Sequence, residues 1–152
     1  MLYKNILVPF DKSTHAERAL ETAVKLVSDD PEAKITVLYV VDPTEEEDIT
    51  FTVAARMAGV PANNIANEEN LRAGKVAQIQ SIIEPLVKDA PQEISVKVVT
   101  GKAHHAILNY AYDRENDIII MGCRGLNAIR GVMGSVSYAV LRSAECPVLI
   151  IK

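Results

Sequence analysis

Five short apolar segments, separated by segments of helical periodicity, constrain the fold of this sequence more than any other feature. Several of them are apolar nearly throughout instead of alternating, which is the pattern of strands covered by helices on both faces of a sheet. We therefore expect five strands in one sheet. The segments are NILVPF at 5–10, KITVLYVV at 34–41, ISVKVVT at 94–100, DIIIMG at 117–122 and PVLIIK at 147–152.

The segments between these strands have the apolar spacing of amphipathic helices. Thr14 and Glu17 at the start of the first have capping-box spacing. Pro85 is expected to kink or shorten the second helix near its end. Strands that alternate with helices predict an α/β fold, an open parallel sheet with right-handed crossovers. The helical spacing covers residues 14–27, 68–90, 106–111 and 136–144.

Length and composition indicate one globular domain over residues 1–152. The sequence is 49% hydrophobic and 24% charged, and no apolar run approaches the roughly 18 to 20 residues that span a bilayer. The first apolar run is followed by acidic Asp11 and does not have the form of a signal peptide. We expect a cytoplasmic protein without a membrane partner, in which residues 42–67 form a variable insert or a lid.

Charge and residue types argue against nucleic acid and against a metal site built from side chains alone. The net charge is -4 and the 16 Lys and Arg residues are scattered, so no basic stripe is expected for a nucleic-acid backbone. The acidic run TEEED lacks the spacing and the central glycine of a calcium loop. His104 and His105 have no further ligands at metal-binding spacing, so we expect them on the surface at a helix start.

In an open parallel sheet, ligands bind beyond the carboxyl ends of the strands, where the strand order reverses. The loop after the first strand contains no glycine, and no G-x-x-x-x-G-K-[ST] occurs in the sequence. Both the dinucleotide fingerprint and the P-loop are therefore excluded. The loop after the fourth strand, in contrast, is rich in glycine: MGCRGLNAIRGVMGSVS at 121–137.

This loop has the chemistry of a phosphate site. Glycines permit close backbone approach, and the G-S-x-S segment at 134–137 offers helix-start N–H groups and two hydroxyls to an anion. Arg124 and Arg130 are candidates for added positive charge. A loop that merely joins strand to helix is the alternative. Asp11 is a candidate acceptor for a ribose hydroxyl or a base amine, or else a turn or cap residue, and the backbone near Val40 is a candidate for the adenine edge.

These features resemble the universal stress protein family. The resemblance rests on YKNILVPFDKSTHAERAL, VLYVVDP, DIIIMGCRG and GSVSYAVLRSAECPVLIIK, and only 42–70 has little to match. It implies the strand order 3-2-1-4-5. One branch of the family binds ATP through G-x2-G-x9-G-[ST], which Gly122, Gly125, Gly134 and Ser135 match with a spacer of eight residues, LNAIRGVM, in place of nine.

The resemblance also implies a ligand, a set of binding residues and a dimer. ATP, or AMP or ADP, would be bound with Mg or Mn bridging the phosphates, and two chains would pair through their final strands at 147–152. No role is expected for Cys123, a redox-sensing thiol being the alternative. The implied nucleotide-binding residues are Pro9, Phe10, Asp11, Val40, Met121, Gly122, Arg124, Gly125, Gly134, Ser135, Val136 and Ser137.

Three functions follow from these patterns. The leading hypothesis is an ATP-binding regulatory protein of the stress response that acts as a dimer. The second is a slow ATP hydrolase, for which Asp11 and Asp42 are the evident carboxylates; phosphoryl transfer needs a positioned nucleophile and charge neutralisation. The third is a dimeric interaction protein that binds no nucleotide, which the shorter spacer keeps open. No catalytic residue is assigned.

Overall fold

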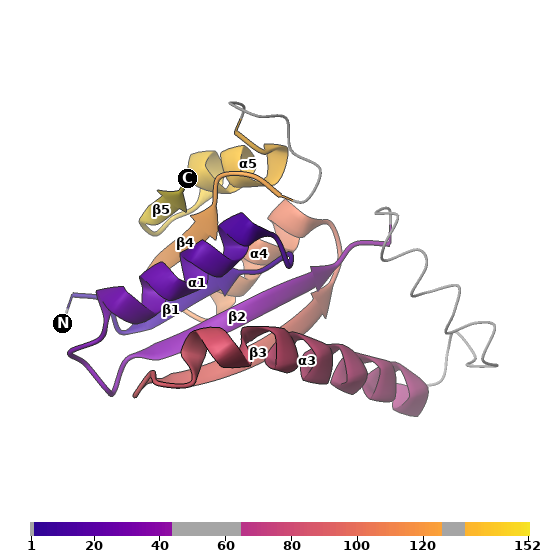
Figure 1. The fold of residues 1–152 in the computed structure, drawn as a ribbon. Helices are drawn as coiled ribbons and strands as arrows, with labels where there is room; N and C mark the ends of the chain where they lie inside the picture. The colour runs from indigo at the N-terminus through magenta and orange to yellow at the C-terminus, as the bar shows by residue number, and fades with distance from the viewer. Residues whose placement is uncertain (1, 44–64, 126–132) are drawn as a thin grey trace.

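The computed structural model describes residues 2–43, 65–125 and 133–152 (Figure 1). Its sheet has five strands in the order β3-β2-β1-β4-β5, and every pairing is parallel. The predicted sheet and strand order are confirmed, and each strand boundary lies within one residue of the predicted one. The strands are β1 Asn5–Pro9, β2 Lys34–Val41, β3 Glu93–Thr100, β4 Ile118–Gly122 and β5 Val148–Ile151.

Helices cover both faces of the sheet, as the apolar strands require. Along β1, Ile6 and Val8 point into a cluster with α1 and α3, whereas Leu7 points into a second cluster with α4 and α5. All three side chains are fully buried, and burial of each stabilises the fold by about 1.5–3 kcal/mol. The helices are α1 Thr14–Leu26, α3 Ile65–Val87, α4 Ala103–Asp113 and α5 Ser135–Ser143.

The strand order determines where loops meet. β1 pairs with β2 on one side and with β4 on the other, and Ile6 lies beside both Ile35 and Ile118. The chain leaves β1 towards β2 and β3, and later returns to form β4 and β5 on the opposite side. The loops that follow β1 and β4 therefore lie next to each other at the carboxyl edge of the sheet, which is the position at which such sheets bind ligands.

The predicted N-cap of α1 is wrong, whereas the predicted shortening of α3 near Pro85 is confirmed. The N-cap of α1 is Ser13 and not Thr14: the Ser13 hydroxyl accepts the N–H of Ala16 at 3.1 Å, and Thr14 is already helical. The cap needs an extended backbone, which Ser13 adopts. Helix α3 ends at Val87, so Ala90 lies beyond it. Pro85 cannot donate to the preceding turn, and the helix stops two residues after it.

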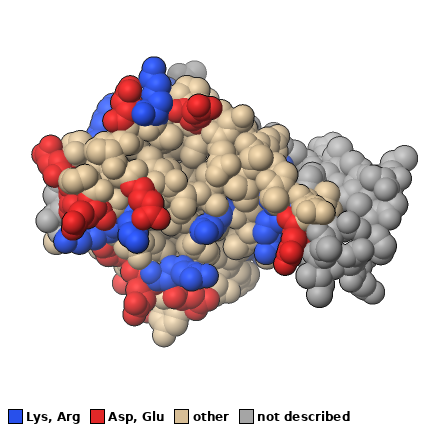
Figure 2. Space-filling view, turned by 90° about the horizontal axis from the view of Figure 1, so that it is seen from below, with Lys and Arg blue, Asp and Glu red and all other residues tan. Residues whose placement is uncertain are grey.

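The sequence argues against nucleic-acid and membrane partners, and the surface charge and the helix lengths of the structure bear on each. On the face shown in Figure 2, acidic and basic side chains lie next to each other in mixed groups with uncharged surface between the groups, so that face carries no basic stripe of the kind that follows a nucleic-acid backbone. Within the ranges that the structure describes, no helix is both long enough and apolar enough to cross a membrane. Residues 44–64 of the predicted insert lie outside the described residues.

Candidate functional site

Asp11 begins the turn that connects β1 to α1. Its Oδ1 accepts the N–H of Ser13 at 2.9 Å, and Lys12 between them has a positive φ of 68°. This arrangement is an Asx turn, in which a carboxylate replaces a backbone acceptor. Asp11 is therefore a turn residue, which was one of the two roles considered for it from the sequence. The turn fixes one carboxylate oxygen of Asp11, while the side chain stays exposed.

The second oxygen of Asp11 faces the glycine loop that follows β4. A Cβ atom placed on Gly125 would lie 2.7 Å from Asp11 Oδ2. The structure thus brings together the acidic residue and the loop that the sequence had assigned to one site. The contact also explains Gly125, because any side chain there would push against the carboxylate.

The loop after β4 is closed by a backbone hydrogen bond. The N–H of Gly134 donates to the C=O of Cys123 at 2.7 Å, and the N–H of Cys123 donates to the C=O of Ile151 at 2.8 Å. A Cβ atom on Gly134 would meet the Cys123 carbonyl at 3.4 Å, so the two chain segments lie close together. Arg130 and the rest of 126–132 lie outside the described residues.

Helix α5 presents its amino end at the same edge of the sheet. Its first helical hydrogen bond runs from the N–H of Tyr138 to the C=O of Gly134 at 3.0 Å, and the N-cap Gly134 makes no side-chain cap. The N–H groups of Ser135, Val136 and Ser137 precede that bond, so the helix itself does not use them. Unused N–H groups and the positive end of the helix dipole favour an anion.

Gly122 and Ser137 have packing roles that sequence reasoning missed. A Cβ atom on Gly122 would lie 2.6 Å from His15 Cβ and 2.9 Å from the His15 carbonyl carbon, because the first turn of α1 rests on the end of β4. The Ser137 hydroxyl is buried and donates to the C=O of Gly122 at 2.7 Å. Of the two hydroxyls expected to face an anion, only that of Ser135 is exposed. The expectation was wrong for Ser137, because buried hydroxyls need a partner inside the protein.

Three residues predicted to bind nucleotide contribute their side chains to the core instead. Phe10 is 3% exposed and packs with α1, and its N–H donates to Leu38 at 2.8 Å. Met121 is 4% exposed and packs on the side of α4 and α5. Pro9 is buried at the end of β1. Their side chains are therefore not available to a ligand in this structure.

The remaining predicted residues are partly accessible. Val40 is half-buried near the end of β2, packed against the cluster of α4 and α5, and Val136 packs on the same cluster from α5. Arg124 is half-buried in the loop after β4.

His104 and His105 lie at a helix start, as predicted. His104 and His105 occupy the first turn of α4 with ring centroids 4.2 Å apart, and His15 lies in the first turn of α1. Desolvation lowers the pKa of His104, helped by the charges of His105 and Lys102. In the described part of the chain, no group of three or more His, Cys, Asp or Glu residues is placed to hold a metal ion.

Both cysteines are free thiols. Cys123 is buried at the start of the glycine loop, directly after β4. Cys146 is partly buried, and burial raises the pKa of its thiol, so it is a weaker nucleophile than an exposed cysteine.

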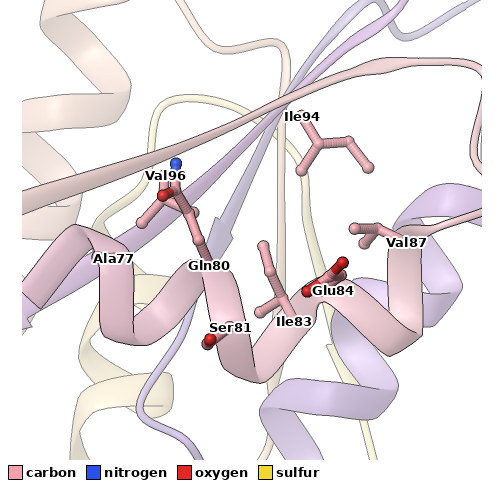
Figure 3. A pocket seen from close by; sticks show the side chains of 8 residues that line it. All are labelled: Ala77, Gln80, Ser81, Ile83, Glu84, Val87, Ile94 and Val96. Atoms are coloured by element: carbon pink, nitrogen blue, oxygen red, sulfur yellow. The ribbon is translucent and has the colours of Figure 1, made fainter.

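A groove of about 410 Å³ lies elsewhere, between α3 and β3 (Figure 3). Ile83 and Val87 on α3 face Ile94 on β3 across it, and Glu84 is its charged residue. A second hollow of about 710 Å³ lies between α4 and α5 and is lined by Asp113, Glu115 and Glu145 among others. Neither contains a residue predicted to bind nucleotide. Among its described lining residues the first groove offers no positive charge and its only charged residue is Glu84, and the acidic lining of the second is unsuited to phosphate, so the junction of Asp11 and Gly125 remains the candidate site.

The model of the universal stress protein family matches residues 2–152. Universal stress protein MJ0577 of Methanocaldococcus jannaschii is 31% identical over 159 residues, covering 100% of this chain and 96% of that protein. The structure of universal stress protein UspA from Lactobacillus plantarum aligns with a TM-score of 0.73 at 27% identity, over 100% of this chain and 99% of that chain.

One further structure, of a universal stress protein in complex with cAMP, aligns with a TM-score of 0.67 at 22% identity, over 100% of this chain and 99% of that chain.

Proposed function

Because this chain belongs to the universal stress protein family, we propose that it is a regulatory protein of the stress response that binds an adenine nucleotide. ATP is the preferred ligand, with AMP and ADP as related ligands. The observation that carries this proposal is the contact between Asp11 and Gly125, which joins a carboxylate to a glycine loop at the carboxyl edge of the sheet. A fold relative was solved with the adenine nucleotide cAMP.

The two ends of the site suit the two ends of a nucleotide. Asp11 Oδ2 stands beside Gly125 and is an acceptor for a ribose hydroxyl. The N–H groups at the start of α5 bind phosphate oxygens, with the exposed Ser135 hydroxyl as an added donor. The backbone near Pro9 and Val40 borders the adenine. A Mg or Mn ion would be held mainly by phosphate oxygens, because such ions need only one or two protein carboxylates.

We further propose that two chains pair through residues 147–152 in the cytoplasm. β5 stands at one end of the strand order and pairs only with β4 among the described strands. An unpaired strand edge is a template for another strand. Large exposed apolar side chains lie next to it, with Leu149 on β5 37% exposed and Leu141 on α5 46% exposed. A monomeric mass by light scattering at micromolar concentration would reject this pairing.

Calorimetric titration of wild-type protein and two matched variants tests the nucleotide site. Asp11→Asn removes the charge that meets the ribose. Asp30→Asn is the control, because the Asp30 carboxylate also accepts the N–H of the residue two positions ahead, which is Glu32. A hydrogen bond to a charged group contributes about 1.5–3 kcal/mol, so Asp11→Asn should weaken ATP binding about tenfold or more. Asp30→Asn should leave it unchanged.

Two outcomes would reject the proposal. The first is equal affinity of the wild-type protein and Asp11→Asn. The second is the absence of ATP binding together with the absence of nucleotide in the supernatant of denatured purified protein. That second outcome favours the nucleotide-free interaction protein.

A further inference from the structure

Ser137 differs from the other hydroxyl in the GSVS segment. Its side chain is 4% exposed and its Oγ donates to the C=O of Gly122 at 2.7 Å, whereas Ser135, two residues earlier, is exposed. A buried hydroxyl at that distance from a carbonyl is fully engaged as a donor. Ser137 therefore has no proton to offer a ligand while this bond is formed.

We propose that Ser137 is a positioning residue, which holds the amino end of α5 against the end of β4 so that the N–H groups of Ser135 and Val136 are ready for phosphate. The inference rests on the proposed nucleotide function and specifies how the phosphate half of that site is organised. In this inference Ser137 raises the affinity for phosphate although its hydroxyl does not touch the ligand.

The acceptor of this bond is itself fixed. Gly122 lies against the first turn of α1, with 2.6 Å between a Cβ on Gly122 and His15 Cβ, so the end of β4 cannot move towards α1. The start of α5 is held a second time, by the bond from the Gly134 N–H to the Cys123 C=O at 2.7 Å. Two bonds, at Gly134 and Ser137, therefore bracket the N–H groups of Ser135 and Val136.

Removal of the Ser137 hydroxyl leaves only the first of these bonds. The α5 terminus then becomes mobile, and the N–H groups have to be ordered when a ligand binds. The lost conformational entropy lowers the affinity for that ligand. Because these groups meet phosphate while Asp11 meets the ribose, the loss should appear for AMP and ATP and not for adenosine.

Competition against a fluorescent ATP analogue measures all three ligands in the wild-type protein and four variants. Ser137→Ala removes the bond, Ser137→Thr keeps the hydroxyl, Ser137→Cys substitutes a weaker donor, and Ser135→Ala removes an exposed hydroxyl. We expect Ser137→Ala to weaken AMP and ATP about fivefold, the equivalent of one hydrogen bond, with adenosine unchanged. Ser137→Thr should restore the affinity, and Ser137→Cys should be intermediate if the alanine variant does not fold.

Amide hydrogen exchange in the nucleotide-free protein separates positioning from direct contact. Exchange at Gly134 and Tyr138 should accelerate in Ser137→Ala and not in Ser135→Ala. Unchanged exchange together with weaker ATP binding would mean that the hydroxyl contacts the ligand, which overturns the proposal. An equal loss for adenosine and ATP, or no loss, overturns it too. Failure of the wild-type protein to bind any adenine nucleotide rejects the proposed function first, and the inference with it.

Discussion

A Cβ atom on Gly125 would lie 2.7 Å from Oδ2 of Asp11, although the two residues are separated by most of the chain. The contact exists because β1 and β4 are neighbours in the sheet. It makes Gly125 a sensitive position for ligand binding and a tolerant one for folding, since the neighbouring atom is the far end of an exposed side chain and not backbone.

Gly125→Ala should therefore reduce ATP affinity about tenfold, by displacing the Asp11 carboxylate, while the melting temperature changes little. Calorimetric titration and thermal unfolding of the same preparation test both parts. A large fall in melting temperature would show that Gly125 supports the fold rather than the ligand.

Gly74→Ala is the matched control, since a Cβ atom on Gly74 meets nothing within 4 Å. Gly74 is an exposed residue inside α3, where alanine is favoured over glycine by about 0.5–1 kcal/mol. Urea unfolding should show this gain in stability, with ATP affinity unchanged. A loss of stability would contradict the open space at this position.

Gly122→Ala should act on the fold, because the added Cβ would meet His15 Cβ and the α1 backbone at 2.6 and 2.9 Å. Overpacking of this kind costs about 1–3 kcal/mol. We expect the urea midpoint to fall by a corresponding amount in the absence of nucleotide. A midpoint equal to that of the wild-type protein would mean that α1 can move away at no cost.

Ser13→Ala and Thr14→Ala distinguish the observed N-cap of α1 from the predicted one. The Ser13 hydroxyl accepts the Ala16 N–H, so its removal should cost about 1 kcal/mol of unfolding free energy. Thr14→Ala should be close to neutral, because alanine is a good helix former. The reverse order of the two losses would restore Thr14 as the cap.

Stability should fall in acid through His104. Desolvation, followed by the charges of His105 and Lys102, lowers its pKa below the usual 6.5 in the folded state. The unfolded chain then binds the proton more tightly, so stability is full above about pH 6.5 and is lost as the pH falls through that value towards the folded pKa. His104→Gln should flatten the change in urea midpoint between about pH 7 and pH 5.

His105→Gln should change this pH dependence less than His104→Gln does. It removes the charge of His105 but leaves the desolvation of His104, which is the larger cause of the lowered pKa. An NMR titration of His104 gives the pKa directly. A midpoint at or above that of a free histidine would contradict the prediction.

The sheet could be predicted because strands buried on both faces leave a direct mark in the sequence. The run DIIIM needs apolar neighbours above and below, and Ile119 and Ile120 lie in opposite core clusters. The ends of the helices were harder to predict than the strands. Ser13 and Thr14 are adjacent residues that can both cap a helix, and the Asx turn made by Asp11 ends at Ser13.

The candidate site was predictable in its location and less so in its roles. Loops after β1 and β4 meet because of the strand order, which the family resemblance implies. Whether a glycine serves a ligand or a neighbouring helix depends on distances that no spacing encodes: Gly125 faces a carboxylate, whereas Gly122 faces α1. The burial of Ser137 could have been predicted, because it lies three residues before the buried Val140 and therefore on the same face of α5.

The peptide groups of Cys123 link two structures through the backbone alone. Its N–H completes the pairing of β4 with β5, and its C=O closes the glycine loop at Gly134. Replacement of the side chain leaves both bonds in place, so an alanine scan would register only the packing of the thiol. The contribution of this position to the loop can be seen only by methods that alter or observe the main chain, such as amide-to-ester substitution or amide exchange.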